Sequence, residues 1–520
     1  MADITYTVLI DWDNDGSVLA GSPTSGEDVT ARVLNVRTGQ AFSYGRDTAR
    51  SLSAVKPAQV SVELNNVTKD YSPDNSSSPL YGDLGTGKPV LIYATHSAVT
   101  YELFYGYIDG YSIDPFREKK SVMLTCVDNL AKVASARIQT ECYPSIQTGA
   151  AIHACLDAAG WDEDLRDIDA GASTLRYWVA DQTDAWTAIQ EIVQSEGLPA
   201  IAYVDPETGN FVFKDRHHRL LDSASLTSQA TFRDTGSEPL FSDPVEYNVG
   251  YRDLINTCVF RVPERQPQAF DEVWQTESTF VVSTGETMVI YATASERFIG
   301  AVTPEEDVDY KLLSGSATVT LSQTSGLTTQ ITIEAGSTAY IEGMKIRAYS
   351  CPVAREFVTS SIHVDSVDKY GIASPDDSST PKHCGVNDMK AIGDIIVAQR
   401  AERLPVFTLT VKGANDTRKV QILSRKLSDM VTIVEAETST NHTHFIEKIG
   451  HSITLAGKLH TATFGCERVP SPGTQFTFGV AGQGFDQGTF GLSGFDDADT
   501  VFILDSAVSG HRLGTGKLAT

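Results

Sequence analysis

The sequence predicts a mainly β protein with one smaller α/β module. Short β-branched or alternating runs, bounded by Gly, Pro, Asn and Asp, fill residues 1–134 and return from 236 to about 470. Between 135 and 235 apolar residues recur instead at three- and four-residue spacing, which is typical of helices. Because alternation of period two indicates half-buried strands, the first of these regions should fold as a barrel or a sandwich.

In the first region, four short runs carry this prediction. Each is rich in β-branched or alternating apolar residues, and turn residues separate it from the next. The expected strands cover 6–10, 60–64, 90–93 and 121–126.

The middle region should hold two helices and a hairpin. Ser145 is the expected cap of the first helix, which should end at Gly160. Thr183 should start the second helix, and Gly197 should end it. A turn at 205–210 contains both Pro and Gly, which preset turn dihedrals, so it predicts a hairpin.

The later region should contain a second β-domain with an insertion. One helix is expected over 387–403, broken by Pro405. A Thr-, Val- and Ser-rich run at 277–355 predicts an inserted β-sandwich, which leaves 236–276 and 356–470 for the second β-domain. The last residues, 471–520, repeat a Phe/Gly/Asp theme too poor in aliphatic residues for a core. They should form an extended tail, ordered only where its Phe residues find a partner groove.

Length and composition indicate a folded chain of several domains. At 520 residues the chain exceeds the roughly 250–300 residues at which one hydrophobic core stops growing, so we expect three or four domains. The 41% hydrophobic and 21% charged residues argue against bulk disorder and against a fibrous class.

The charge balance argues against a nucleic-acid-binding surface. The formal net charge is −26, with 67 acidic against 41 basic residues, and the basic residues are scattered. Two interpretations stay open. The acidity can serve solubility, or it can belong to a channel wall along which DNA slides without sticking.

The cysteines and the hydropathy bear on the compartment. The seven cysteines lie far apart without a CxxC pair, so we expect buried thiols made in a reducing cytoplasm. No run reaches the roughly 18–20 apolar residues that span a bilayer, and no signal peptide precedes the first strand. We therefore expect neither export by a signal peptide nor a membrane-spanning segment.

A string of four motifs between 62 and 90 is the most specific signal in the chain. The four motifs are Val62-Glu63-Leu64-Asn65-Asn66, Tyr71-Ser72-Pro73, Ser78-Pro79-Leu80-Tyr81-Gly82 and Gly87-Lys88-Pro89-Val90. This string resembles the signature of the hub or tail-associated proteins of long-tailed phages, in particular the minor tail proteins of phages that infect actinobacteria. The run at 104–108 is similar to the strand that follows in this family.

Segments of the later β region resemble the family's second barrel, in the same order. One departure is that the family often closes the last segment with Trp, where this chain has Lys458-Leu459-His460. The segments are Asn256, 366–371 ending in Tyr370-Gly371, 427–431, and 445–449 with His451 and Ile453.

The resemblance implies two tail-tube-like β-barrels, at 1–134 and at 236–276 with 356–470, joined by the α/β module at 135–235. It also implies a homotrimer, in which three chains with two barrels each form a six-fold ring that matches a hexameric tube. The implied role is a structural baseplate hub at the tail tip of the virion. Such a hub closes the tail tube, supports host attachment and genome ejection, and lines the DNA path without binding DNA specifically. The implied partners are the distal tail protein ring, the tape measure protein, and tail fibre or other minor tail proteins.

Two other functions compete with a hub. A receptor-binding adhesin would use the inserted sandwich and the Phe/Gly tail to grip a host glycan, and it would sit peripherally rather than on the tail axis. A cell-wall hydrolase, carried by some family members, is disfavoured because the residues past 470 are too few for a catalytic domain. We expect no enzymatic activity and no catalytic residues.

One loop has the beginning of a calcium-binding pattern. Asp11, Asp13 and Asp15 supply carboxylates at positions 1, 3 and 5, and Gly16 stands at position 6, where the loop must turn sharply. Position 12 should be a bidentate Glu, and it is Ser22. The competing interpretation is a polar turn between strands. These three aspartates are the metal candidates, with calcium as the ion and no other cofactor expected.

Other motif-like runs are expected to carry no chemistry. The P-loop spacing at 82–89 ends in Pro89, which lacks the hydroxyl for Mg²⁺ and the N–H for phosphate. His442 and His444 alternate on a probable strand and make only two ligands, so a solvated strand face is expected. The run at 216–219, with two histidines between arginines, should be a polar strand end, and 491–495 lacks the second Gly of a nucleophile elbow.

Overall fold

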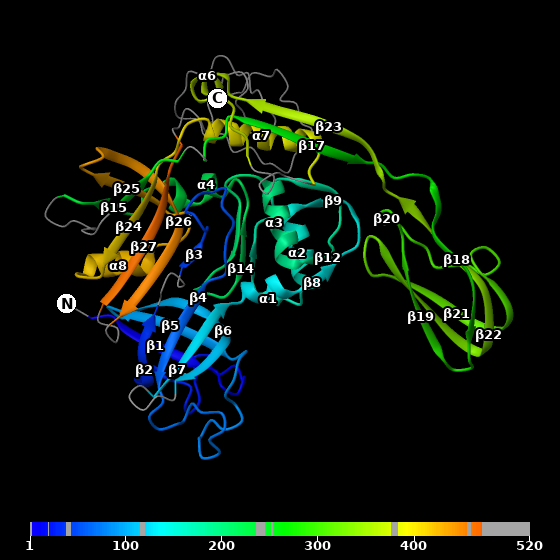
Figure 1. The fold of residues 1–520 in the computed structure, drawn as a ribbon, viewed down its shortest axis with the longest axis horizontal. Coiled ribbons are helices and arrows are strands. Elements are labelled where there is room, and N and C mark those ends of the chain that lie inside the picture. Colours follow the sequence, from blue (N-terminus) through cyan, green and yellow to red (C-terminus); the bar gives the residue numbers. More distant parts are fainter. Residues whose placement is uncertain are drawn as a thin grey trace, which may run out of the picture.

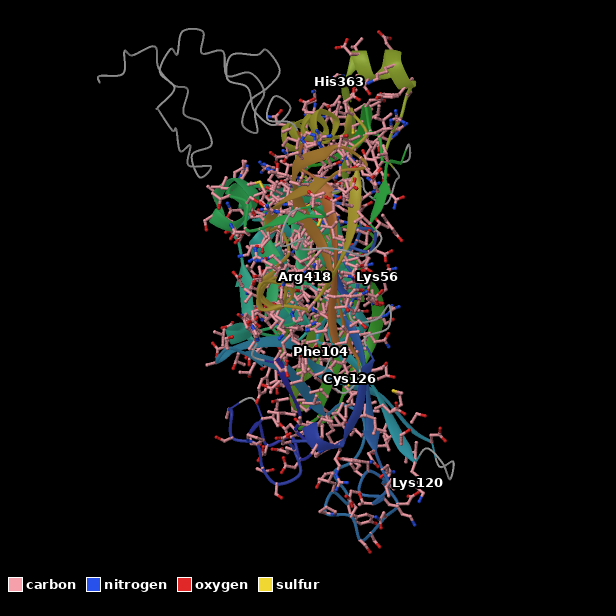
Figure 2. All side chains as sticks on the ribbon, turned by 90° about the vertical axis from the view of Figure 1, so that its left-hand side faces the viewer. Lys56, Phe104, Lys120, Cys126, His363 and Arg418 are labelled. Atoms are coloured by element: carbon pink, nitrogen blue, oxygen red, sulfur yellow. The ribbon has the colours of Figure 1, made fainter. Side chains whose placement is uncertain are left out.

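The computed structural model describes residues 3–18, 20–37, 43–114, 120–235, 245–250, 253–375, 383–454 and 459–470. Strands outweigh helices, and the sheets include a nearly closed barrel and a half-barrel, so the mainly β fold is confirmed (Figure 1). Turned by 90°, the molecule is a tall, narrow slab with Phe104 and Cys126 in its lower part and His363 near its top (Figure 2). The predicted tail at 471–520 lies outside the described residues.

The first sheet has six antiparallel strands in the order β1-β5-β6-β7-β4-β2. Its inward side chains follow the predicted alternation: Val60, Val62 and Leu64 on β4 are fully buried. Each such side chain contributes roughly 1.5–3 kcal/mol of burial free energy, which fixes the register of the sheet. The strands are β1 (Thr5–Ile10), β2 (Val33–Arg37), β4 (Gln59–Asn65), β5 (Pro89–His96), β6 (Val99–Asp114) and β7 (Ser121–Asp128), and a short 3-10 turn, η1 (Thr30–Arg32), precedes β2.

The α/β module packs its helices α2 and α3 against short sheets. The predicted hairpin is confirmed as β13 and β14. The helical elements are α1 (Leu130–Ser135), α2 (Thr148–Ala158), η2 (Glu163–Leu165), α3 (Ala185–Glu196), α4 (His218–Leu221) and α5 (Ser223–Leu226). The strands are β8 (Arg137–Gln139), β9 (Tyr143–Gln147), β10 (Arg166–Ile168), β11 (Thr174–Trp178), β12 (Asp181–Asp184), β13 (Ile201–Val204) and β14 (Phe211–Lys214).

Both predicted helix starts in this module were placed too early. Ser145 lies in β9, paired with Arg176, and the helix begins at Thr148. Thr183 lies in β12, and α3 begins at Ala185. In each case a strand pairing with a distant segment uses the residues that local capping preferences assign to a helix. The two helix ends are confirmed, because the glycines that follow both have positive φ, +71° at 160 and +92° at 197.

The second large sheet takes a strand from the first region. Its order is β15-β25-β26-β27-β24-β16, and β3 (Ser43–Gly45) pairs with β26 at 448–450. The remaining strands are β15 (Thr231–Arg233), β16 (Glu246–Asn248), β24 (Val406–Lys412), β25 (Met430–Glu435), β26 (Thr440–Thr454) and β27 (Leu459–Arg468). The helix α8 (Asp416–Ser424) packs on β24 and β27.

A two-stranded ribbon, β17 (Thr257–Arg265) with β23 (Val353–Ile362), carries the inserted segment away from the body (Figure 1). The helix α7 (Val386–Arg400) packs along this ribbon, and α6 (Val364–Tyr370) follows it. The inserted strands are joined by hydrogen bonds into one sheet around their own core, with the long β22 at its centre. They are β18 (Phe270–Val282), β19 (Thr287–Thr293), β20 (Phe298–Ile299), β21 (Lys311–Gln323) and β22 (Thr328–Ser350).

Candidate functional site

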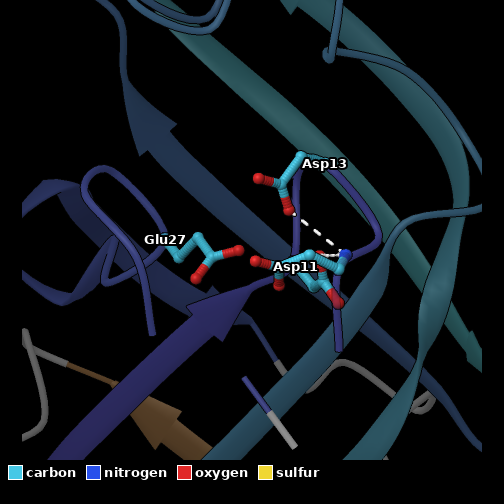
Figure 3. Close-up of side chains that lie close together, drawn as sticks. Asp11, Asp13 and Glu27 are labelled. Carbon is cyan, nitrogen blue, oxygen red and sulfur yellow. Dashed lines mark hydrogen bonds between the residues drawn. The ribbon is translucent and has the colours of Figure 1, made fainter. Parts of the chain in front are cut away.

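Four carboxylates gather at the end of β1. Asp11 follows this strand directly, and Asp13 and Asp15 lie in the loop that leaves it. The chain returns to β1 at Glu27, where the Ile10 N–H donates a hydrogen bond to the Glu27 carbonyl oxygen at 2.9 Å. As a result one oxygen from each of the four side chains lies within 4.8 Å of the others. Figure 3 shows Asp11, Asp13 and Glu27 side by side at this point. We call Asp11, Asp13, Asp15 and Glu27 the acid cluster.

The loop is folded around the buried carboxylate of Asp11. This side chain accepts hydrogen bonds from the backbone N–H groups of Asp15 at 3.1 Å and Gly16 at 2.9 Å. Gly16 has a φ of +79°, as the calcium-type pattern requires at this position. The predicted turn is therefore present, and Asp11 is only 1% exposed.

Glu27 was not a predicted site residue, and it is almost as deeply buried, at 2% exposure. Its Oε2 accepts hydrogen bonds from the Ser17 hydroxyl at 2.8 Å and from the Thr24 backbone N–H. Its Oε1 is buried and has no hydrogen-bond partner within the described residues. None of the ion pairs formed within those residues involves any member of the acid cluster.

The pKa values of the two exposed carboxyls in the cluster are shifted in opposite directions. Loss of hydration, together with the charges of Asp15, Glu27 and Asp11, raises the pKa of Asp13 above its ordinary value. Hydrogen bonds from the side chain and backbone of Ser17 lower the pKa of Asp15. The cluster thus concentrates negative charge at one point of the barrel.

The most specific family-like motifs fold a loop that packs beside this cluster. Asn66 accepts a hydrogen bond from the Tyr71 backbone N–H at 3.0 Å and donates to the Ser72 hydroxyl at 3.0 Å. The Tyr71 ring lies 6.0 Å from that of Trp12, between centroids, and Trp12 is buried inside the acid loop. A side chain at Gly26 would contact Leu80. The motif residues at 66–82 therefore act by shaping this end of the barrel.

A buried charged junction joins the three parts of the body. Glu447 on β26 is 1% exposed and pairs with Arg46 at 3.0 Å and with Arg219 at 2.7 Å. Arg46 also donates to the carbonyl oxygens of Pro199 at 3.0 Å and Ala200 at 2.8 Å. The first region, the α/β module and the second large sheet meet at this one carboxylate.

A second buried pair lies next to the first. Arg400, at the end of α7, contacts both oxygens of Glu467 on β27, and Ser51 donates its backbone N–H to the same carboxylate at 3.1 Å. Burial alone would raise the pKa of Glu467, and the charge and hydrogen bonds of Arg400 outweigh burial, so the pKa lies below its ordinary value. Arg216, Arg219 and these side chains line a cavity of about 50 Å³.

The later family-like segments also contact one another or the module. Asn256 is fully buried; its amide donates to the carbonyl oxygen of Gly371 at 2.8 Å and accepts from the Ala373 N–H at 2.8 Å. Ser428 has a φ of +66°, and its hydroxyl lies 3.0 Å from His218 Nε2. Segments that are far apart in the sequence are thus paired by buried polar contacts.

Two of the sequence predictions about histidines are wrong. The run at 216–219 is not a polar strand end, because Arg216, His218 and Arg219 are buried where α4 meets β26. His444 is not on a solvated face; it is fully buried with its ring against Phe407, at 5.2 Å between centroids. Two other expectations are confirmed: β5 and not a helix follows the P-loop-like spacing, and all seven cysteines are free and buried. The run at 491–495 lies outside the described residues.

The buried position of Glu447 could have been predicted from the sequence, because apolar residues alternate with it along one strand. Strand β26 places Phe445, Glu447 and Ile449 in alternation, and all three are buried. A carboxylate at an inward position of a strand requires a buried cation elsewhere in the chain. The sequence does not identify which arginines pair with Glu447, because they come from positions 46 and 219, far from it in the chain.

No protein-family model matches the chain, and no curated protein matches its sequence. Among solved structures, those that match the chain include phage tail proteins. The tail protein from Neisseria meningitidis MC58 matches with a TM-score of 0.47 and 8% identity, covering 89% of this chain and 96% of that chain. The 43 kDa tail protein of prophage MuSo2 from Shewanella oneidensis matches with a TM-score of 0.44 and 8% identity, covering 89% and 98%. The prophage tail protein gp18 from Listeria monocytogenes matches with a TM-score of 0.37 and 9% identity, covering 90% and 95%.

Of the helices in the described ranges, none combines the length and the apolar character that crossing a membrane requires.

Proposed function

We propose that this chain is a structural hub of a phage tail tip, which closes the tail tube and anchors neighbouring tail proteins, and that it is not an enzyme. The observation that carries the proposal is where the family-like segments lie. Residues of the later set lie where the second large sheet meets the other parts of the body. Ser428 and Glu447, from two of these segments, converge on Arg219 of the α/β module.

A rigid connection between the two large sheets supports the same role. Strand β3 leaves the first region and pairs with β26, and Arg46, directly after β3, is held by Glu447. Two barrels that take neighbouring places in one ring need a fixed relative orientation, and a shared strand with a buried ion pair supplies it. We propose that three copies form the hub, with six barrels matching a hexameric tube. Its neighbours would be the distal tail protein ring, the tape measure protein and tail fibres or other minor tail proteins.

A density map of the intact particle tests this proposal. A fusion of a small folded tag to the N-terminus would mark the chain in the map. We expect three copies around the tail axis, each contributing two barrels to the inner wall. Six copies, one barrel per chain, or a position away from the axis would contradict a hub.

A receptor-binding role is the second candidate, and the inserted sheet favours it. This sheet projects from the body on a ribbon (Figure 1). Tyr291, Tyr340 and Tyr349 on it are 42–65% exposed. Exposed tyrosines are enriched at recognition surfaces because the ring is both apolar and hydrogen-bonding. Binding of the full chain to host cell walls, lost in Tyr291→Ala and retained in Tyr81→Ala on the first barrel, would support this role.

A further inference from the structure

We infer that Asp11, Asp13, Asp15 and Glu27 together bind one calcium ion per chain. The inference does not depend on the tail assignment, because it uses only the geometry of the acid cluster.

The first argument is that the structure supplies the ligand missing from the sequence pattern. A calcium loop of this type needs an acidic side chain opposite positions 1, 3 and 5, and Ser22 cannot provide it at position 12. The backbone of 27–29 runs antiparallel to β1, with hydrogen bonds from Ile10 N to Glu27 O at 2.9 Å and from Val29 N to Val8 O at 3.1 Å. This pairing places the Glu27 carboxylate beside those of Asp11, Asp13 and Asp15.

The second argument is the oxygen of Glu27 that has no donor. Oε1 is buried and unpartnered within the described residues, whereas Oε2 is saturated by Ser17 and Thr24. A buried carboxylate oxygen without a hydrogen bond or cation is strongly unfavourable, so such an atom marks a place where a partner is missing. Figure 3 shows the Glu27 carboxylate pointing towards that of Asp11. A cation between them would satisfy both.

The dimensions and the ligand type select calcium. The four oxygens all lie within 4.8 Å of one another, a span no larger than about twice a calcium–oxygen distance of roughly 2.4 Å, as contact with one ion requires. Magnesium keeps most of its water and takes only one or two carboxylates. Zinc and copper favour His or Cys ligands, and the cluster contains neither, whereas manganese, like calcium, accepts carboxylates. Water and backbone carbonyls would complete the coordination.

The bound ion would stiffen one end of the first barrel. It would join the end of β1 to the segment that returns at Glu27, and Trp12 and Gly26 from these two segments both pack against the motif loop at 66–82. Calcium would therefore stabilise the loop that carries the most family-like residues.

Calorimetric titration of the full chain with calcium chloride, after treatment with a chelator, tests the site. We expect one ion per chain and a rise in melting temperature of about 5–10 °C at a free calcium concentration roughly 100-fold above Kd. Glu27→Gln keeps the shape of the side chain and should abolish binding. Asp28→Asn changes the exposed neighbouring carboxylate and should leave binding unchanged.

Two further measurements keep the test decisive if Glu27→Gln folds poorly. Asp13 is exposed, so Asp13→Asn should fold normally and weaken calcium binding at least tenfold. Terbium, a calcium-sized ion, should luminesce on excitation of Trp12 and should lose that emission in Trp12→Phe. No heat and no melting shift with calcium, unchanged affinity in Asp13→Asn, or an equal response to magnesium chloride would each overturn the inference.

Discussion

Neutralising Glu447 is the sharpest test of the buried junction. In Glu447→Gln the side chain keeps its size, and its amide can accept from one arginine while presenting an N–H₂ group to the other. Arg46 and Arg219 stay charged, because a guanidinium does not lose its proton in a protein. Both side chains are more than 90% buried, so water cannot replace the lost partner.

The expected loss follows from this burial. Removing one partner of a buried ion pair typically destabilises a protein by about 3–5 kcal/mol, since an uncompensated charge remains. Glu356→Gln is the matched control, because Glu356 and its partner Arg261 are 53% and 75% exposed. Exposed pairs contribute only about 0–1 kcal/mol.

Urea unfolding of both variants, followed by hydrogen exchange at the junction amides, gives the comparison. The double variant Glu447→Gln with Arg219→Gln should recover part of the loss, because it removes one charge from each side. Equal destabilisation by Glu447→Gln and Glu356→Gln would refute the reasoning. So would a double variant whose loss of unfolding free energy exceeds the sum of the losses in Glu447→Gln and Arg219→Gln.

Three other outcomes can be measured. Burial lowers the pKa of His444 to about 4, below the value of about 6.5 in the unfolded chain. Between about pH 6.5 and pH 4 the unfolded chain therefore binds more protons than the folded chain, so about 3 kcal/mol of stability should be lost as the pH falls through this range. The melting temperature of His444→Gln should depend less on pH than that of the unaltered chain. Asn256→Ala should cost about 1–3 kcal/mol locally by leaving the part-buried Ala373 N–H without its acceptor, seen as faster hydrogen exchange over 364–373. If the barrels form a DNA path, an assembled structure should show the channel wall more acidic than the exterior, since screening limits repulsion to about 8–10 Å.

The sequence predicted the parts of the fold that depend on local patterns. The strands at 60–64 and 121–126, the hairpin around 205–210 and the glycine-ended helices α2 and α3 follow from alternation and turn residues, whose causes lie within a few positions. The helix starts were wrong because β9 and β12 compete for the same residues through pairings with segments about 30 to 45 positions away.

The parts that the sequence could not predict depend on residues far apart in the chain. Asp11, Asp13 and Asp15 share one loop and were identified from spacing alone. Glu27 joins them only because its backbone pairs with β1, and no motif records that pairing. The arginines of the junction are separated from Glu447 by up to 401 positions, so only the folded chain reveals which arginine pairs with which carboxylate.

The ribbon of β17 and β23 has an evolutionary consequence. Its strands run antiparallel, and Arg265 pairs with Val353 where they reach the inserted sheet, so the chain leaves and re-enters the body at neighbouring backbone positions. Adjacent residues of such a pair lie only about 5 Å apart. Any domain whose two ends lie equally close can be exchanged here without moving a residue of the junction. The ribbon is thus an attachment point, and a lineage can exchange the inserted sheet while the buried contacts of the body stay constant.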